Sequence, residues 1–335
     1  MIVVIGEVLV DLVAEGGGRF AARPGGGPYN TARTLARLGA PVVFAGRLSH
    51  DGFGRMLRDR LEADGVRLGI SEPSALPTTL AVADIDEGGS AQYSFYLEKT
   101  AAADVSYDDL ATTVTATTVT GATVTGATAV AVNGGALGFV MDPIASSIER
   151  LVAEALPADA LLMVDPNCRP GTIDDREGYL RRLNRIFARA DVVKASVEDL
   201  AYLFPSLPPE EAAATLLRQG AALVLVTDGP RPARAFLPTF SPTFSPKGRE
   251  ISVAVPEVDV VDTIGAGDAF GGAFLAAWAE AGLGHAELRD PAPETADAIR
   301  DALAFAAEAA ARTCARPGAD PPSRAEMTWK PISRH

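Results

Sequence analysis

The stretch Asp262-Thr263-Ile264-Gly265-Ala266-Gly267-Asp268-Ala269-Phe270 joins a β-branched apolar segment to a long alanine-rich helical pattern. Gly265 and Gly267 permit backbone angles that other residues avoid, so successive N–H groups can converge where a helix macrodipole is most positive. This geometry predicts an anion-binding turn. A carboxylate beside a bound phosphate is unfavourable unless it accepts a proton during the reaction. The position of Asp268 therefore predicts phosphoryl transfer in which this residue acts as general base. The alternative interpretation is an ordinary helix start with an acidic first turn.

Composition limits the classes of partner and the compartment. The chain has 335 residues, of which 47% are hydrophobic, enough for one large α/β domain with an appendage or for two equal domains. Its net charge of -13 argues against nucleic-acid and membrane partners, because both need clustered Lys and Arg. The two cysteines, Cys168 and Cys314, lie in no metal-binding spacing, so we expect free thiols in a reducing cytoplasm. The apolar start, Met1 to Val13, contains two acids and resembles a buried strand rather than a signal peptide. No apolar run reaches transmembrane length.

The first part of the chain alternates predicted strands and helices. Ile2 to Ile5 is a continuous apolar run, typical of a strand that is covered on both faces. A helix is predicted from Tyr29 and ends at Gly39, a strand follows at Pro41 to Ala45, and Arg55 to Asp64 is the next helix. This order predicts a parallel sheet.

Three segments interrupt that series. Thr78 to Tyr96 alternates apolar and polar residues, which predicts an antiparallel hairpin of the kind that often forms a lid. Ala111 to Val130 contains near-repeats of a five-residue unit, where we expect a short helix, an expansion without chemistry, and a strand at Ala129 to Val132. A duplication at 239–246 predicts a lengthened surface loop.

Four polar or glycine-rich turns each follow an apolar strand. They are Gly6 to Asp11, Asp165 to Arg169, Thr227 to Gly229 and Asp262 to Asp268. Because parallel strands end at one edge of a sheet, we expect these turns to line a single crevice. The absence of GxxxxGK[ST], GxGxxG, HRD and DFG argues against a P-loop protein, a dinucleotide-dependent dehydrogenase and a protein kinase.

These residues resemble the ribokinase-like (PfkB) family of carbohydrate and nucleoside kinases, and fructokinase-like members most of all. Asp262 to Asp268 looks like the DTxGAGD signature of the family, and Gly25 to Ala32 resembles its N-terminal glycine-rich signature. The resemblance runs from Gly6 to about Pro321. It implies an α/β fold, with a three-layer α/β/α domain, a mostly parallel central sheet and a small β-sheet lid. The kinase domain would comprise 1–10, 26–77 and 99–335, and the lid 11–25 and 78–98.

The resemblance also implies roles for individual residues. The catalytic set is Asp268 as general base, the amides of Gly265, Ala266 and Gly267 as anion hole, and Arg169 near the transferred phosphate. The sugar-binding set is Asp11, Gly26, Gly27, Asn30 and Tyr96. The ATP-binding set is Lys194, Thr227, Gly229, Thr263 and Ala304. The metal set is Asp199 or Glu198 for Mg²⁺ through water, and Asp262 for the K⁺ ion of potassium-activated members. Family members often form homodimers through their lids.

Two positions depart from the family pattern. The family often has Asn-x-x-Glu before the nucleotide site, whereas this chain has Ser196-Val197-Glu198-Asp199, so the Mg²⁺ role passes to Asp199 or Glu198. Pro230, Pro232 and Ala233 follow Gly229, where the family usually has a second glycine. Both differences concern nucleotide binding and leave the predicted reaction class unchanged.

The predicted function is ATP-dependent phosphorylation of a sugar hydroxyl under a lid that excludes water. In fructokinase-like and 2-keto-3-deoxygluconate kinase-like members an Arg commonly follows the aromatic pair of the lid, but Leu97 stands there in this chain. This favours a neutral sugar, with fructose or a related ketohexose first. The alternatives are a nucleoside kinase, since an aromatic lid residue could stack on a base, and a 2-keto-3-deoxygluconate kinase. A non-catalytic sugar or nucleotide sensor is a further hypothesis, which the intact Asp268 and glycines disfavour.

Overall fold

The structure is a computed structural model of the chain, and it describes residues 1–85, 91–120, 129–132, 137–238 and 249–328. The strands are β1 (Ile2–Ile5), β2 (Leu9–Gly16), β3 (Arg19–Gly25), β4 (Val42–Ala45), β5 (Arg67–Leu68), β6 (Leu80–Ile85), β7 (Ala91–Tyr96), β8 (Ala129–Val132), β9 (Leu161–Val164), β10 (Val192–Ser196), β11 (Leu223–Thr227), β12 (Ala233–Leu237) and β13 (Arg249–Val253). The α-helices are α1 (Gly27–Arg37), α2 (Gly52–Ala63), α3 (Tyr107–Thr120), α4 (Ile144–Glu154), α5 (Arg176–Phe187), α6 (Val197–Leu203), α7 (Pro209–Gln219), α8 (Ala266–Glu280), α9 (His285–Arg289) and α10 (Thr295–Cys314). The alternation confirms the predicted α/β class.

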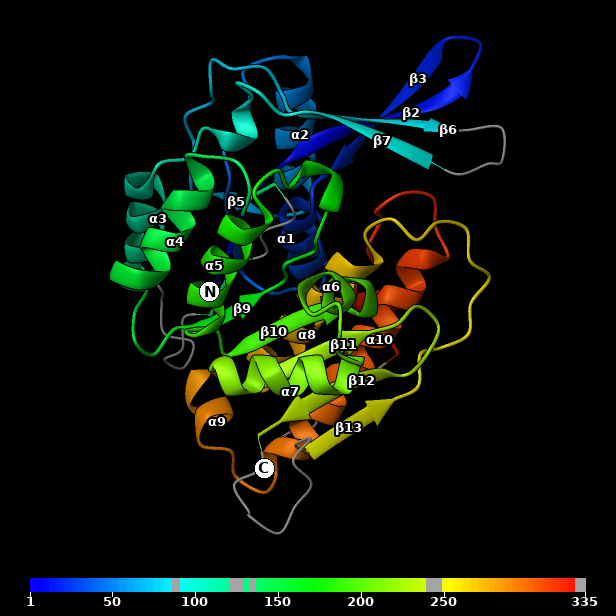
Figure 1. Cartoon of the computed structure of the whole chain (residues 1–335). Coiled ribbons are helices and arrows are strands. Elements are labelled where there is room, and N and C mark those ends of the chain that lie inside the picture. Colours follow the sequence, from blue (N-terminus) through cyan, green and yellow to red (C-terminus); the bar gives the residue numbers. More distant parts are fainter. Residues whose placement is uncertain (86–90, 121–128, 133–136, 239–248, 329–335) are drawn as a thin grey trace.

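The larger sheet has nine strands in the order β13-β12-β11-β10-β9-β8-β1-β4-β5 (Figure 1). Neighbouring strands from β11 to β5 pair in parallel, while β12 and β13 are antiparallel. All four residues of β1 are buried, as expected of a strand with helices on both faces. Ile2 and Val4 belong to one hydrophobic cluster, and Val3 and Ile5 to the other. The alternation of side chains along a strand thus gives this sheet two separate cores.

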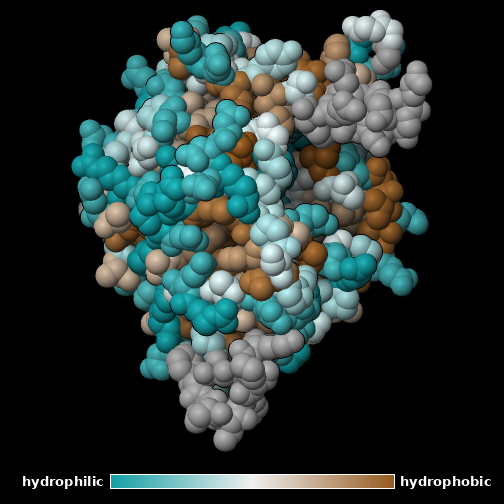
Figure 2. All heavy atoms as spheres, in the orientation of Figure 1, coloured by the Kyte–Doolittle hydropathy of each residue, from teal (hydrophilic) through white to brown (hydrophobic). Residues whose placement is uncertain are grey.

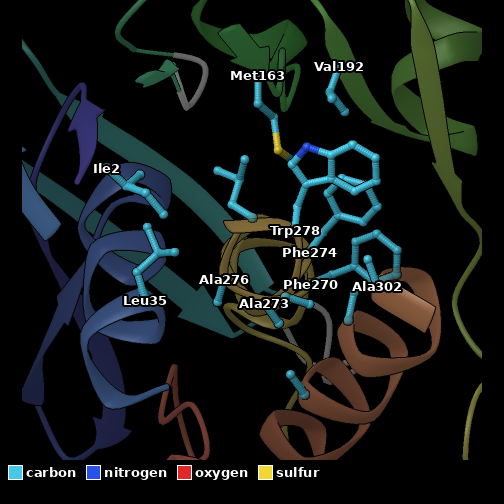
Figure 3. Close-up of a cluster of buried hydrophobic side chains, with 14 of the residues drawn as sticks. Ile2, Leu35, Met163, Val192, Phe270, Ala273, Phe274, Ala276, Trp278 and Ala302 are labelled. Carbon is cyan, nitrogen blue, oxygen red and sulfur yellow. The ribbon is translucent and has the colours of Figure 1, made fainter. Parts of the chain in front are cut away.

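Each core is closed by its own set of helices. The cluster that contains Ile2 includes buried residues of α1, α8 and α10, whereas the cluster that contains Val3 includes residues of α3, α4, α5, α6 and α7. Figure 3 shows α8 between α1 and α10, with Trp278 directed towards Met163 and Val192. The rings of Phe274 and Trp278 stack, with centroids 6.0 Å apart. This packing holds α8 against the sheet.

The smaller sheet has four strands in the order β3-β2-β6-β7, and it projects at the upper right of Figure 1. β6 and β7 form the antiparallel hairpin that the sequence predicts, β2 and β3 form a second hairpin, and β2 and β6 pair in parallel. This sheet corresponds to the segments predicted as a lid. The division of the chain into two domains stays a prediction.

The repeat-containing segments are only partly described. The first half of the repeat lies in α3, and β8 is the predicted strand at its end. Residues 121–128 and the duplication at 239–246 lie outside the described residues. In the part of the chain that the structure describes, no helix combines the length and the apolar character needed to cross a membrane.

Candidate active site

Glycines bring the start of α1 against the turn that follows β1. Gly26 has φ 107, and a Cβ at this position would lie 2.9 Å from the Glu7 backbone oxygen. A Cβ on Gly25 would lie 2.1 Å from Oδ2 of Asp11. Only glycine permits both the left-handed backbone and these close approaches. As a result, Asn30 in the first turns of α1 lies beside Glu7 and Asp11 at one end of the sheet.

The start of α8 carries the predicted base. Gly265 caps the helix in the left-handed conformation, with φ 78, and a Cβ there would lie 2.5 Å from the Cβ of Ala319. Asp268 follows in the first turn, where Nδ2 of Asn30 donates a hydrogen bond of 2.9 Å to its Oδ2. Burial raises the pKa of Asp268, and the Asn30 hydrogen bond and the charges of Lys194 and Arg169 oppose that rise. Asp268 is therefore more basic than an exposed aspartate, a property that suits proton abstraction.

A buried ion pair lies next to Asp268. Nζ of Lys194 on β10 donates to Oδ2 of Asp165, which follows β9, at 2.5 Å, and both side chains are 4% exposed. Burial raises the pKa of Asp165 to about 6, and Lys194 limits the rise. Burial alone would lower the pKa of Lys194, but Asp165, Asp199 and Asp268 raise it. Lys194 is thus a buried positive charge beside the turn at Asp262 to Asp268, here called the anion turn. Its Nζ lies 3.3 Å from the position that a Cβ on Gly267 would take.

One cavity, here called the first cavity, has a volume of about 450 Å³ and brings most of the predicted sugar-binding and catalytic residues together. The predicted residues in its lining are Asp11, Gly26, Gly27, Asn30, Arg169, Lys194, Thr263, Gly265, Gly267 and Asp268. Leu9, Phe95 and Leu137 form its apolar part, and Glu7, Asp165, Asn167 and Ile264 complete it. The guanidinium of Arg169 donates to the carbonyl oxygens of Asn167 and Cys168 in its own loop.

The structure places Phe95, and not Tyr96, in the wall of this cavity. Asp11, Ala81 and Phe95 are register partners across β2, β6 and β7, so their side chains share one face of the small sheet. Tyr96 points from the other face and is 60% exposed. A shift of one residue along a strand reverses the face, so Tyr96, which the resemblance implies as a sugar-binding residue, lies outside this cavity and its neighbour Phe95 lines it.

The second cavity, of about 530 Å³, lies on the other side of the anion turn. Its lining includes the predicted residues Thr227, Gly229, Thr263, Ala266 and Gly267. Its apolar part comes from the connection after β13 and from α8 and α10, with Val255, Val258, Val260, Phe270, Ala307, Ala310 and Ala311. Figure 2 shows hydrophobic residues on the right of this face, where the yellow connection after β13 lies in Figure 1. Two of the residues predicted to bind ATP are not part of this lining. Ala304 lies earlier on α10, and Lys194 lines the first cavity instead.

The four strand-end turns therefore divide between two cavities instead of lining one crevice. The turns at Glu7 to Asp11, Asp165 to Arg169 and Gly265 to Asp268 face the first cavity, and the turn at Thr227 to Gly229 faces the second. Thr263 and Gly267 line both. The anion turn is thus the wall that the two cavities share.

The carboxylates predicted to hold Mg²⁺ lie outside both cavities. Oδ1 of Asp199 accepts the Cys168 amide at 2.6 Å, and Oδ2 accepts the Ser196 amide at 2.8 Å, so Asp199 caps α6 and anchors the loop after β9. Glu198 is exposed in the first turn of the same helix. Among the described residues, no group of three or more His, Cys, Asp and Glu is placed to hold a metal ion. The Mg²⁺ role of these two residues stays a prediction.

Asp262 organises the backbone behind the anion turn. Its Oδ1 accepts the Ile264 amide at 3.0 Å, and its Oδ2 accepts the Gly318 amide at 2.8 Å. These bonds hold the segment after α10 against Gly265, where Ala319 fills the space beside the glycine. Its predicted K⁺ role stays a prediction.

Glu7 is a cavity residue that the sequence-based set omits. It is 2% exposed, it lines the first cavity, and its Oε2 accepts the Gly138 amide at 3.2 Å. Burial raises its pKa to about 7. The available signal was an acid two residues after an apolar strand, but the same pattern also fits a solvated turn.

The chain is similar to known proteins of one family. The family profile described as pfkB family carbohydrate kinase matches residues 1–326. The chain belongs to the pfkB family of carbohydrate kinases. As a carbohydrate kinase it transfers a phosphoryl group from ATP to an alcohol group.

Curated relatives of the kinase include fructokinases from bacteria and plants. A fructokinase from Rhizobium leguminosarum bv. trifolii is 32% identical over 280 residues, which cover 82% of this chain and 79% of that protein. Probable fructokinase-4 from Arabidopsis thaliana is 30% identical over 338 residues, which cover 98% of this chain and 95% of that protein.

Solved fructokinase structures share the fold of the kinase. The fructokinase from Xylella fastidiosa with bound ATP matches with a TM-score of 0.76 at 28% identity, covering 95% of this chain and 93% of that chain. The fructokinase from Vibrio cholerae O395 with fructose, ADP and calcium ion matches with a TM-score of 0.73 at 25% identity, covering 95% and 94%. The kinase thus has a ribokinase-like α/β fold.

Proposed function

We propose that this kinase phosphorylates a hydroxyl of a small neutral sugar, with fructose or a related ketohexose first. The observation that carries the proposal is the anion turn shared by two cavities, one rich in carboxylates and amides and one largely apolar. The sugar binds in the first cavity and ATP in the second. The reacting hydroxyl and the phosphoryl group then meet at Gly267.

Asp268 takes the proton of the reacting hydroxyl. Asn30 fixes the carboxylate through a 2.9 Å hydrogen bond, and Lys194 and Arg169 favour its ionised form. The amides of Gly265, Ala266 and Gly267, with Arg169, stabilise the charge that develops during transfer. The lid sheet, through Phe95 and Asp11, covers the sugar and excludes water that would otherwise accept the phosphoryl group.

The hydrogen-bonding character of the first cavity supports a neutral sugar. Oδ1 of Asn30 is buried and lacks a hydrogen-bond partner among the described residues. Burial raises the pKa of Asp11 to about 6, and Arg169 opposes the rise. These two groups accept hydrogen bonds from sugar hydroxyls, whereas a sugar acid would add a negative charge beside Asp11 and Asp268. A nucleoside remains the alternative because Phe95 could stack on a base.

The second cavity fits a nucleotide. Its apolar part suits a base, and Thr227, Gly229 and Thr263 offer hydroxyl and backbone groups to the phosphates. Mg²⁺ would be held largely by the ATP phosphates and water, with Asp199 or Glu198 acting through water, and it would neutralise phosphate charge. Another structure of the Vibrio cholerae fructokinase, a double mutant, contains fructose, ADP and a potassium ion, which supports testing K⁺ at Asp262.

We also propose a homodimer formed through the lid. The face of the small sheet opposite Asp11 carries Leu12, Leu80, Phe20 and Tyr96, of which Phe20 is 47% and Tyr96 60% exposed. An apolar sheet face of this kind suits a second copy of the same sheet. Light scattering should give twice the mass of one chain, and a Tyr96→Glu variant should be monomeric. A wild-type monomer at micromolar concentration would exclude this dimer.

The decisive experiment for the function is ADP release with Mg-ATP against fructose, other ketohexoses, aldoses, nucleosides and 2-keto-3-deoxygluconate. We expect turnover with a ketohexose, and a loss of roughly 10²- to 10⁴-fold in kcat for Asp268→Asn, the range typical of a general base. Sugar binding without ADP release for any compound would favour the sensor hypothesis. Full turnover by Asp268→Asn would exclude Asp268 as the base.

A further inference from the structure

Glu7 is a buried carboxylate in the first cavity to which the proposed chemistry assigns no role. It follows β1, is 2% exposed, and shares the cavity lining with Asp11, Asn30 and Asp268. An ionised side chain at this depth is unfavourable unless it gains a strong partner. Glu7 therefore needs strong hydrogen-bond donors when it is ionised.

The residues that the structure describes satisfy the Glu7 carboxylate only in part. Oε2 accepts the Gly138 amide at 3.2 Å, at the long end of the range for such bonds. Burial raises the pKa of Glu7 to about 7, its own backbone amide and the Gly138 amide oppose the rise, and Asp268 adds to it. Arg169, across the cavity, also favours ionisation but forms no ion pair with Glu7 among the described residues. A carboxylate has about four acceptor sites, so capacity remains for a ligand.

The backbone around Glu7 is fixed by close packing. The space beside the Glu7 carbonyl is filled by Gly26, and a Cβ on Gly46 would lie 2.3 Å from the carbonyl oxygen of Gly6. The backbone that carries Glu7 is therefore held in place, which lowers the ordering cost when a ligand binds its carboxylate. The alternative is that Glu7 only anchors Gly138, but hydrogen bonds to neutral amides do not require a charge on the carboxyl group.

We propose that Glu7 is a specificity-determining residue whose carboxylate accepts a hydrogen bond from a hydroxyl of the sugar other than the one that is phosphorylated. This inference rests on the proposed sugar kinase function. In it, Asp268 receives the reacting hydroxyl, while Glu7 and Asp11 hold others, and Phe95 and Leu137 contact the apolar side of the ring or chain. The bound hydroxyl stabilises ionised Glu7, so sugar affinity decreases as the pH falls through about 7.

The matched variant is Glu7→Gln, which has the same length and retains an oxygen for the Gly138 amide but carries no charge. Sugar binding is measured by calorimetry without nucleotide, and kcat and KM by ADP release, at about pH 6 and about pH 8. A hydrogen bond to a charged group contributes enough that we expect Kd and KM to rise roughly 10- to 100-fold at about pH 8, with kcat within about threefold. The pH dependence of Kd in the wild type should be smaller in the variant. Glu154→Gln, at an exposed acid on α4, is the control and should match the wild type.

Deoxy analogues of the sugar identify the hydroxyl. For one analogue the wild type and Glu7→Gln should bind equally, because the group that Glu7 holds is already missing, whereas the other analogues should retain the full difference. Unchanged Kd in Glu7→Gln, or an equal loss for every analogue, would overturn the assignment and leave Glu7 as an anchor for Gly138. If wild-type protein released no ADP with any sugar, the proposed function would fail instead, a result that calorimetry of the same samples separates from a failure of Glu7.

Discussion

Replacing Lys194 by Met tests whether the buried ion pair beside Asp268 stabilises the fold through its charges. Met keeps most of the apolar length of the side chain and removes the charge that faces Asp165 at 2.5 Å. With both side chains 4% exposed, the variant leaves an uncompensated buried carboxylate. Breaking such a pair typically costs about 3 to 5 kcal/mol of unfolding free energy. We expect a loss of that size for Lys194→Met near pH 8.

The loss should depend on pH. In the folded wild type the pKa of Asp165 is about 6, above its ordinary value of 3.8, and without Lys194 it will be higher still. A carboxyl whose folded pKa is raised destabilises the fold when it is ionised, and the penalty decreases as the pH falls through that pKa and the group takes a proton. Denaturant unfolding of both proteins at about pH 8 and about pH 5.5 should therefore give a much smaller difference at the lower pH.

The double variant separates charge from packing. Asp165→Asn with Lys194→Met removes both charges, so most of the lost unfolding free energy should return. Activity should not return, because Lys194 also favours the ionised form of Asp268, and its loss should move the acid limb of kcat/KM to higher pH. A stability loss that is the same at both pH values, or a double variant no more stable than Lys194→Met, would refute the electrostatic explanation.

Three further predictions concern the anion turn, the lid and the pH profile. Gly265→Ala should lower kcat by about tenfold or more and also lower Tm, because the φ of 78 and the 2.5 Å distance to Ala319 both oppose a Cβ at this position. A Gly265→Ala variant with the kcat of the wild type would contradict this. Phe95→Ala should raise the steady-state KM for the sugar by about 3- to 10-fold, because Phe95 lines the first cavity. Tyr96→Ala, on the other face of the sheet, should leave KM unchanged. A raised KM in Tyr96→Ala alone would show that Tyr96, and not Phe95, contacts the sugar. The wild-type kcat/KM should fall at acid pH with a limb closer to neutrality than that of an ordinary aspartate, because burial raises the pKa of Asp268; a flat profile down to about pH 4 would contradict a buried base.

Local sequence patterns predicted the elements of the fold but not their arrangement. The continuous apolar run of β1 and the alternation of β6 and β7 each reflect which faces are buried, and burial is visible in hydrophobic spacing. The parallel pairing of β2 with β6, and the place of β8 between β1 and β9, join segments far apart in the chain. Such pairings depend on tertiary packing that no window of sequence contains.

The candidate site was predictable where chemistry depends on backbone shape. Gly26 and Gly265 have positive φ and close neighbours, so a glycine pattern reports their geometry directly. The face on which Phe95 lies depends on strand register, and a shift of one residue exchanges it with Tyr96. Burial of Glu7 arises from Gly26 and the loop at Gly138, which lie elsewhere in the sequence.

The order of residues in the anion turn explains how a base and a phosphate can share it. Gly265 and Asp268 line only the first cavity, Ala266 lines only the second, and Gly267 lines both. The carboxylate of Asp268 therefore faces the first cavity, the proposed sugar site, with Asn30, while the turn also borders the second cavity, the proposed nucleotide site. The repulsion that the sequence suggests between Asp268 and a phosphate is reduced by this separation and by the adjacent Lys194. The same arrangement requires the two substrates to approach from opposite sides of one helix start, as in-line transfer to a hydroxyl demands.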